Sequence, residues 1–133
     1  EKLWSQRGEN DFIIGTRTDR ESPLSRKIVS FVSKWTVRLF YSKGISDVNC
    51  PYRLYKNEKF AKSFNKIPPD TFAPNVILSG IACHHHMKII EVPVEFSPRT
   101  TGEVSIQKWK LLKVAVKSWW QTVSFRMKMV SSE

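Results

Sequence analysis

Two arginines have the residue type and the position of phosphate ligands. Arg17 closes a short apolar run at residues 11–17, and Arg99 lies in the loop after a second apolar run at residues 88–96. If both runs are strands, the arginines lie at strand ends, where open α/β sheets place their ligands. A guanidinium offers planar, forked donors that fit phosphate oxygens. The alternative interpretation is that each is a solvated loop arginine.

Arg26 and Ser30 add to this set, because residues four apart share one face of a helix. Near a helix N-terminus such a pair can hold an anion, although the same spacing is ordinary on an exposed face. We therefore predict that Arg17, Arg26, Ser30 and Arg99 converge on one phosphate- or acceptor-binding site.

Asp47 is a carboxylate in a basic neighbourhood, in the segment ISDVNCPYRLYKN at residues 45–57. It follows a glycine that should end a helix and precedes the turn-prone Asn49-Cys50. From the residues alone, Asp47 either caps this turn or pairs with Arg53.

The segment CHHHMK at residues 83–88 does not predict a metal site. Consecutive helical residues point about 100° apart, so the three histidines do not converge on one ion. Cys83 and His86 share a face but supply two ligands, where a zinc site needs three or four. Cys50 and Cys83 are expected as reduced thiols.

The last predicted helix, from about residue 105 to beyond residue 120, alternates tryptophans with lysines. Trp109, Trp119 and Trp120 suit the interface of a membrane, and the lysines suit anionic lipid. The alternative is a core-packing helix with a solvated basic face.

Hydrophobic periodicity predicts the elements that must position these residues. Strands are expected at 11–17, 52–55 and 88–96, and helices at about 24–44, 57–64, 71–85 and 105–120. The predicted helix at about 24–44 carries the apolar stripe of an amphipathic helix: Leu24, Ile28, Phe31, Trp35 and Leu39. This order of strands and helices predicts an α/β layer architecture.

Composition limits the alternatives. The chain has 133 residues, 41% hydrophobic and 12% aromatic, which suits one folded domain. Its net charge of +10 implies an anionic partner. No run of about 18 apolar residues predicts a membrane-spanning helix. The chain begins without an initiator methionine, so we expect a piece of a longer protein.

Five short motifs occur in order: Gly15-Thr16-Arg17, Arg26 with Ser30, Asp47 to Leu54, Glu91 to Val94, and Arg99-x-x-Gly-x-x-Ser105. Together they resemble family 2 glycosyltransferases, in the branch that transfers sugars to dolichyl or polyprenyl phosphate. The likeness covers residues 11–105. It departs from the family where Val48, Cys50 and Pro51 replace the commoner Pro, Ser and Gly, which suggests a different sugar or acceptor.

The resemblance implies a partial GT-A fold, a three-layer α/β architecture that lacks its N-terminal nucleotide-binding half. Residues 1–105 would be the acceptor-side half of the catalytic domain, and residues 106–133 a basic interfacial helix and tail. Mg²⁺ or Mn²⁺ would be bound by the missing half through an Asp-x-Asp motif, so this chain alone would be inactive. An unpaired sheet edge would favour a homo-oligomer.

The implied function is transfer of a sugar from a nucleotide-sugar donor to a polyprenyl-phosphate lipid. The protein would lie in the cytoplasm, peripheral at the inner face of the membrane, and nucleic acid is not an expected partner. Asp47 would be the catalytic residue, placed to orient the sugar or accept a proton. Because a phosphate acceptor is already an anion, orientation is the preferred role.

Two alternatives differ in what they require. A saccharide acceptor in polysaccharide synthesis would need a general base, which would give Asp47 that role. A non-enzymatic basic module that binds nucleic acid or membrane would need aromatic residues interleaved along an exposed surface.

Overall fold

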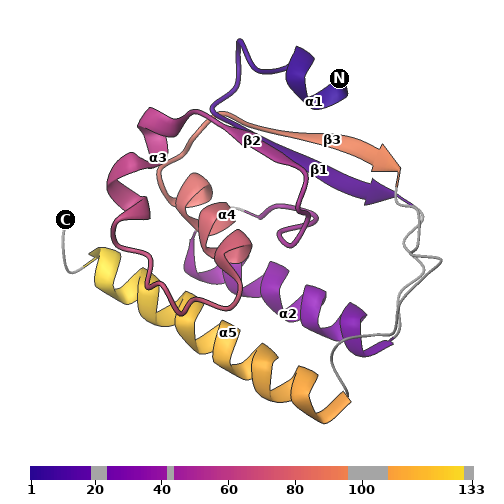
Figure 1. The fold of residues 1–133 in the computed structure, drawn as a ribbon, viewed down its shortest axis with the longest axis vertical. Helices are drawn as coiled ribbons and strands as arrows, with labels where there is room; N and C mark the ends of the chain where they lie inside the picture. Colours follow the sequence, from indigo (N-terminus) through magenta and orange to yellow (C-terminus); the bar gives the residue numbers. More distant parts are fainter. Residues whose placement is uncertain (19–23, 42–43, 96–107, 131–133) are drawn as a thin grey trace.

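The computed structural model describes residues 1–18, 24–41, 44–95 and 108–130. Within the helices, the side chains of residues 25, 26, 108–111 and 130 are outside this description. The described chain is a mixed α/β protein (Figure 1), and its elements are α1 (Lys2–Ser5), β1 (Phe12–Thr18), α2 (Leu24–Phe40), β2 (Arg53–Tyr55), α3 (Asn57–Phe64), α4 (Pro74–His84), β3 (Ile89–Glu95) and α5 (Lys108–Val130).

The three strands form one mixed sheet in the order β2-β1-β3. β1 pairs with β3 in parallel along its whole length, from Phe12 opposite Ile89 to Thr18 opposite Glu95. β2 pairs with the first half of β1 in antiparallel orientation. The predicted strands are therefore confirmed. Because β1 and β3 are parallel, their carboxyl ends meet at one edge of the sheet, as the sequence argument for Arg17 assumed.

The core lies between the sheet and the larger helices. Phe12 and Ile14 of β1 are fully buried against α4, in which every residue from Val76 to Cys83 is buried. Figure 1 shows α2, α4 and α5 on this side of the sheet and α1 on the other side. The sequence did not predict α1, whose Trp4 lines a small pocket together with Ile13 of β1.

Two hydrogen bonds join α5 to the C-terminal end of α2. The Tyr41 hydroxyl donates to the Thr122 carbonyl oxygen at 2.8 Å, and Arg126 Nε donates to the Phe40 carbonyl oxygen at 2.7 Å. Burial raises the pKa of Tyr41, so its hydroxyl keeps its proton. The predicted boundary between residues 105 and 106 lies outside the described residues, but α5 itself contributes Phe125 to the core.

α2 forms as predicted, but its orientation is unexpected. It ends at Phe40, before the predicted stop at Gly44, where the bond from Arg126 gives a terminal carbonyl a tertiary partner. A surface helix normally packs its apolar stripe against the core. Here the stripe is exposed: Leu24 is 74% exposed, Phe31 61% and Leu39 71%. The buried face of α2 is instead narrow and includes Thr36 and Val37.

Candidate functional site

Arg17 and Asp47 form a two-point ion pair at the carboxyl end of β1. Arg17 Nε donates to Asp47 Oδ2 at 2.6 Å, and Arg17 Nη2 donates to Oδ1 at 2.8 Å. The two side chains are only 10% and 12% exposed. The hydrogen bonds to Asp47 raise the pKa of Arg17 above its ordinary value. The pair thus fixes a guanidinium in one orientation at the edge of the sheet where ligands are expected.

The loop that carries Asp47 is held to the sheet by a second carboxylate, Glu91 of β3. Glu91 Oε2 accepts from the Ser46 backbone N–H at 3.0 Å and from the Thr16 hydroxyl at 2.9 Å. The Ser46 hydroxyl adds a hydrogen bond to Glu91 Oε1 at 3.2 Å. Glu91 therefore joins β1, β3 and the loop directly beside the Arg17–Asp47 pair. The sequence placed Glu91 in a motif but assigned it no role.

Arg53 organises the other side of the loop. Its guanidinium donates to the carbonyl oxygens of Cys50, of Val48 at 3.2 Å and of Asn75 at 2.9 Å. Burial lowers the pKa of Arg53 to about 10, so it stays cationic at neutral pH. The Asp47 carboxylate forms a two-point pair with Arg17, which the sequence did not predict. Arg53 donates to carbonyl groups of the loop, and the charge of Asp47 acts to raise the Arg53 pKa against the larger effect of burial.

Gly15 allows the loop to lie close to β1. A Cβ at this position would lie 3.0 Å from a methyl carbon of Val94 and 3.1 Å from Cys50 Sγ. The Gly15 N–H donates to the Tyr52 carbonyl oxygen at 2.8 Å. Burial raises the pKa of the Cys50 thiol, which is therefore protonated and packs as a small apolar group. Neither cysteine forms a disulfide, and both are buried.

The remaining predicted phosphate ligands are only partly described. Ser30 is half-buried on α2 and lies seven residues before the buried Val37, hence on the side of the helix opposite the exposed stripe. Arg26 lies in α2, but its side chain is outside the described residues, as is Arg99. Convergence of the four residues stays a prediction.

The described residues do not fit a divalent cation. Within the parts of the chain that the structure describes, no group of three or more His, Cys, Asp or Glu side chains is placed to hold a metal ion. Both oxygens of Asp47 accept hydrogen bonds from Arg17. The Mg²⁺ or Mn²⁺ that the resemblance implies would need other ligands.

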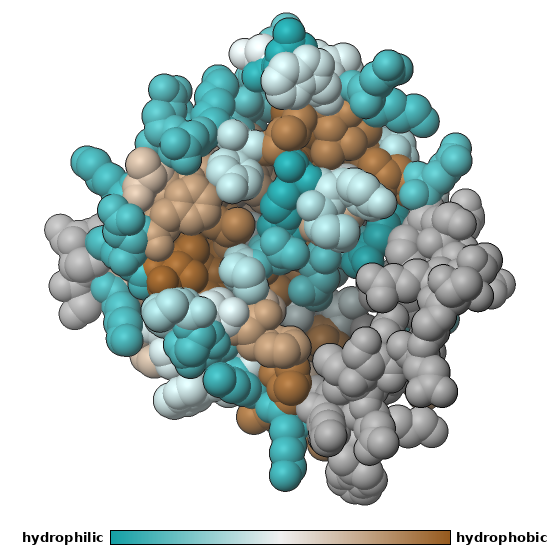
Figure 2. Space-filling view, in the orientation of Figure 1, coloured by the Kyte–Doolittle hydropathy of each residue, from teal (hydrophilic) through white to brown (hydrophobic). Residues whose placement is uncertain are grey.

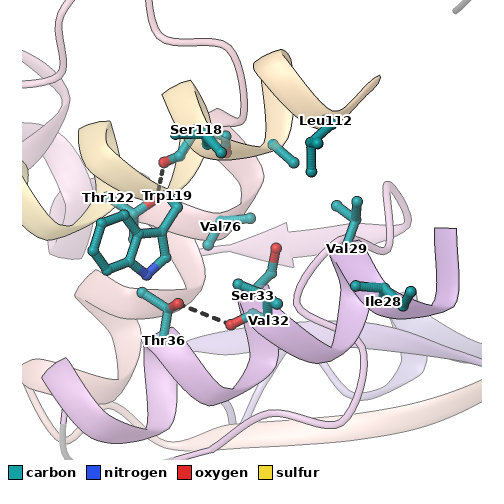
Figure 3. A pocket seen from close by; sticks show the side chains of 12 residues that line it. Ile28, Val29, Val32, Ser33, Thr36, Val76, Leu112, Ser118, Trp119 and Thr122 are labelled. Carbon is teal, nitrogen blue, oxygen red and sulfur yellow. Dashed lines mark hydrogen bonds between the residues drawn. The ribbon is translucent and has the colours of Figure 1, made fainter. Parts of the chain in front are cut away.

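An apolar groove runs between α2 and α5, with a volume of about 240 Å³ (Figure 3). Ile28, Val29 and Val32 line it from α2, and Leu112 and Trp119 from α5. The sequence did not predict this groove, because periodicity does not reveal which helices become neighbours. Trp119 and Trp120 are 39% and 60% exposed, as a membrane-contacting role requires, whereas the side chain of Trp109 is outside the described residues.

No protein-family model matches the chain, and no solved structure matches it. Among the described residues, no helix is both long enough and apolar enough to cross a membrane. The assignment to a family of glycosyltransferases is therefore a proposal that depends on the sequence motifs and on the geometry above.

Proposed function

We propose that this chain is the acceptor-side half of a GT-A glycosyltransferase of family 2, which transfers a sugar from a nucleotide sugar to a polyprenyl phosphate. The observation that carries the proposal is the Arg17–Asp47 pair at the carboxyl end of β1. A guanidinium that is already oriented can hold phosphate oxygens without losing further side-chain entropy. The parallel pairing of β1 and β3 puts it at the edge of the sheet that usually binds ligands.

The reaction would need little covalent participation by the protein. An oxygen of the acceptor phosphate forms a bond to the anomeric carbon of the sugar, while the bond from that carbon to the donor diphosphate breaks. The nucleoside diphosphate leaves with the electron pair. Arg17, with the predicted ligands Arg26, Ser30 and Arg99, would stabilise negative charge where the donor and acceptor phosphates meet.

The ion pair favours a phosphate acceptor over a saccharide acceptor. A saccharide hydroxyl must lose a proton to a general base, and Asp47 is the candidate. Both oxygens of Asp47 already accept hydrogen bonds from Arg17, which suits a residue that orients other groups. Asp47 is therefore assigned a positioning role, through Arg17.

The proposed reaction also requires a membrane surface and a divalent cation. A lipid acceptor requires the protein to work at a membrane surface, and the apolar groove beside the tryptophans of α5 supports such a location. We place the protein in the cytoplasm, at the inner face of the membrane. A divalent cation would neutralise the donor diphosphate from ligands outside the described residues.

The test is an activity assay on the protein expressed from the natural start codon of its gene. Sugar transfer from nucleotide sugars would be measured with polyprenyl phosphate and, separately, with saccharide acceptors, in the presence of Mn²⁺. Arg17→Lys should lower kcat/KM by about a hundredfold, because an ammonium cannot keep the two-point bond to Asp47 and also offer an oriented donor to a phosphate. Arg7→Lys is the matched control, since Arg7 is an exposed arginine of the α1 region. Transfer to saccharides alone, or no transfer at all, would reject the proposal.

A further inference from the structure

The exposed stripe of α2 has the composition of a binding surface. At 3.6 residues per turn, its residues fall within an arc of about 100°. Phe31 and Trp35 lie side by side on it, with ring centroids 5.9 Å apart. Contiguous exposed apolar groups of this kind indicate a site for another molecule.

α5 carries a second apolar strip on the other side of the groove. Leu112, Val116 and Trp120 are each about 60% exposed, and Leu112 and Val116 also line the groove. On α2, Ile28 and Val32 are exposed and line the groove from the opposite side. The two strips and the groove therefore form one continuous surface, called here the α2–α5 face, whose two walls Figure 3 shows.

Basic residues border the α2–α5 face on its outer sides. Lys27 and Arg38 are exposed and follow the outer edge of the α2 stripe, and Lys113 and Lys117 follow the outer edge of the α5 strip. Lys117 Nζ also lies 3.6 Å from Asp70. Figure 2 shows hydrophilic side chains and apolar surface alternating in the lower part of the molecule, where α5 runs.

The two helices carry the entire net charge of the protein. Neither contains an acidic residue, and together they hold ten basic ones: Arg26, Lys27, Lys34, Arg38, Lys108, Lys110, Lys113, Lys117, Arg126 and Lys128. The whole chain has 22 Lys and Arg against 12 Asp and Glu, for a net charge of +10. The rest of the chain is thus electrically balanced, and the exposed Lys27, Arg38, Lys113 and Lys117 beside the apolar strips favour a partner that is both apolar and anionic.

We propose that the α2–α5 face docks onto an anionic lipid bilayer, with both helices lying in the interface. Exposed aromatic and aliphatic groups would insert at the headgroup level, and the bordering lysines and arginines would attract acidic headgroups. The groove between the helices would receive an acyl chain. A second copy of the chain is disfavoured as the partner, because two faces with the same positive charge would repel each other.

This docking adds α2 to the membrane surface that the sequence assigned to α5 alone. It does not depend on sugar transfer, and its test contains no nucleotide sugar. Failure of one proposal would therefore leave the other to be judged by its own experiment.

The test is flotation of the purified 133-residue chain with two kinds of vesicle. One is pure phosphatidylcholine, and the other contains about 30 mol% phosphatidylglycerol to approximate an acidic leaflet. We expect at least about tenfold tighter binding to the anionic vesicles. Phe31→Ser combined with Leu39→Ser should weaken that binding at least about tenfold. Trp4→Ser, at an equally exposed aromatic residue of α1, should change it less than about twofold.

Charge reversal tests the electrostatic part with a matched control. Lys27→Glu with Arg38→Glu should weaken binding to anionic vesicles at least about tenfold. Lys59→Glu with Lys62→Glu makes the same charge change at exposed positions of α3 and should have a clearly smaller effect. Circular dichroism and thermal unfolding would establish that each variant is folded.

Three results would overturn the docking proposal. The first is equal binding of the wild-type chain to neutral and anionic vesicles, or no binding. The second is wild-type binding by the α2 variants while Trp119→Ala with Trp120→Ala abolishes it, which would assign the interface to α5 alone. The third is a wild-type dimer in analytical ultracentrifugation that Phe31→Ser with Leu39→Ser dissociates, with vesicle binding unchanged.

Discussion

Arg17 and Asp47 define the site at the scale of single residues, because each fixes the orientation of the other. Asp47 lies on a loop whose position depends on Glu91, which accepts hydrogen bonds from both Ser46 and Thr16. Arg53 holds the carbonyl groups of the same loop. These contacts hold the guanidinium of Arg17 in one orientation, as the proposed phosphate site requires.

A double-mutant cycle tests whether Arg17 and Arg99 share one anion. We expect Arg17→Lys and Arg99→Lys each to weaken binding of a polyprenyl phosphate by about tenfold, because an ammonium lacks the forked geometry. If both contact the same phosphate, the double variant should lose less than the product of the two effects. Binding is measured by titration calorimetry, and fully additive losses would place the arginines at separate sites.

Asp11 should make stability depend on pH. Its carboxylate accepts from the Lys88 N–H at 3.1 Å and lies 3.3 Å from Lys56 Nζ. The hydrogen bond from Lys88 lowers the pKa of Asp11 below its ordinary value of 3.8. A carboxylate whose pKa is lowered by folding stabilises the folded protein at pH values above its ordinary pKa. This contribution is lost as the pH falls through the pKa of the folded state.

Asp11→Asn should therefore reduce the free energy of unfolding by about 1 kcal/mol at pH 7, with a deficit that shrinks as the pH falls below about 4. Urea unfolding at pH 7, 4 and 3 measures this. Glu9→Gln is the control, because Glu9 is 87% exposed. A deficit of constant size at every pH would show that the charge of Asp11 does not contribute.

At the scale of elements, the contact between α4 and α2 depends on a missing side chain. A Cβ at Gly80 would lie 2.8 Å from a ring carbon of Tyr41, which is fully buried and bonded to α5. Glycine at this position thus lets three helices meet at one point. Since Tyr41 cannot move without breaking its bond to Thr122, the packing there has little tolerance.

Gly80→Ala should therefore destabilise the protein although alanine favours helices. The gain in helix propensity is about 1 kcal/mol, and overpacking costs about 1–3 kcal/mol, so we expect a net loss of about 0–2 kcal/mol. Gly8→Ala is the control, because no atom lies within 4 Å of the added Cβ. Urea unfolding distinguishes the two, and an increase in stability for Gly80→Ala would contradict the packing described here.

At the scale of the whole molecule, the chain separates two kinds of surface. The edge with Arg17 and Asp47 presents polar groups held by ion pairs, and the α2–α5 face presents apolar groups with a basic border. Such a division agrees with the proposed function, in which a charged donor and a lipid acceptor are both bound.

The 133-residue chain by itself should not transfer sugar. A nucleotide-sugar diphosphate needs a divalent cation to neutralise its charge, and that cation needs oxygen ligands from the protein. Asp47 is engaged with Arg17, and the sequence before β1 offers Glu1, Glu9 and Asp11 without an Asp-x-Asp pair. The assay combines the purified chain with nucleotide sugars, polyprenyl phosphate and Mg²⁺ or Mn²⁺. Turnover by a preparation free of other transferases would reject this expectation.

The sequence by itself determined the elements and the residue types of the site. Proline and glycine positions and the apolar periodicity predicted the three strands and the larger helices, because these signals are local. The same reasoning predicted Arg17 just past the end of the first strand, whereas the structure has it as the penultimate residue of β1, opposite Val94 of the parallel β3, near the carboxyl edge of the sheet.

Only the tertiary structure decided how these elements face one another. Asp47 could be paired with Arg17 only in three dimensions, since the two residues are 30 positions apart and nothing local links them. Likewise, the stripe of α2 looked like a core-facing surface, because periodicity shows that apolar residues share a face but does not show what covers that face. The hydrogen bonds of Tyr41 and Arg126 hold α2 and α5 side by side. In this arrangement the stripe stays exposed and is available for binding.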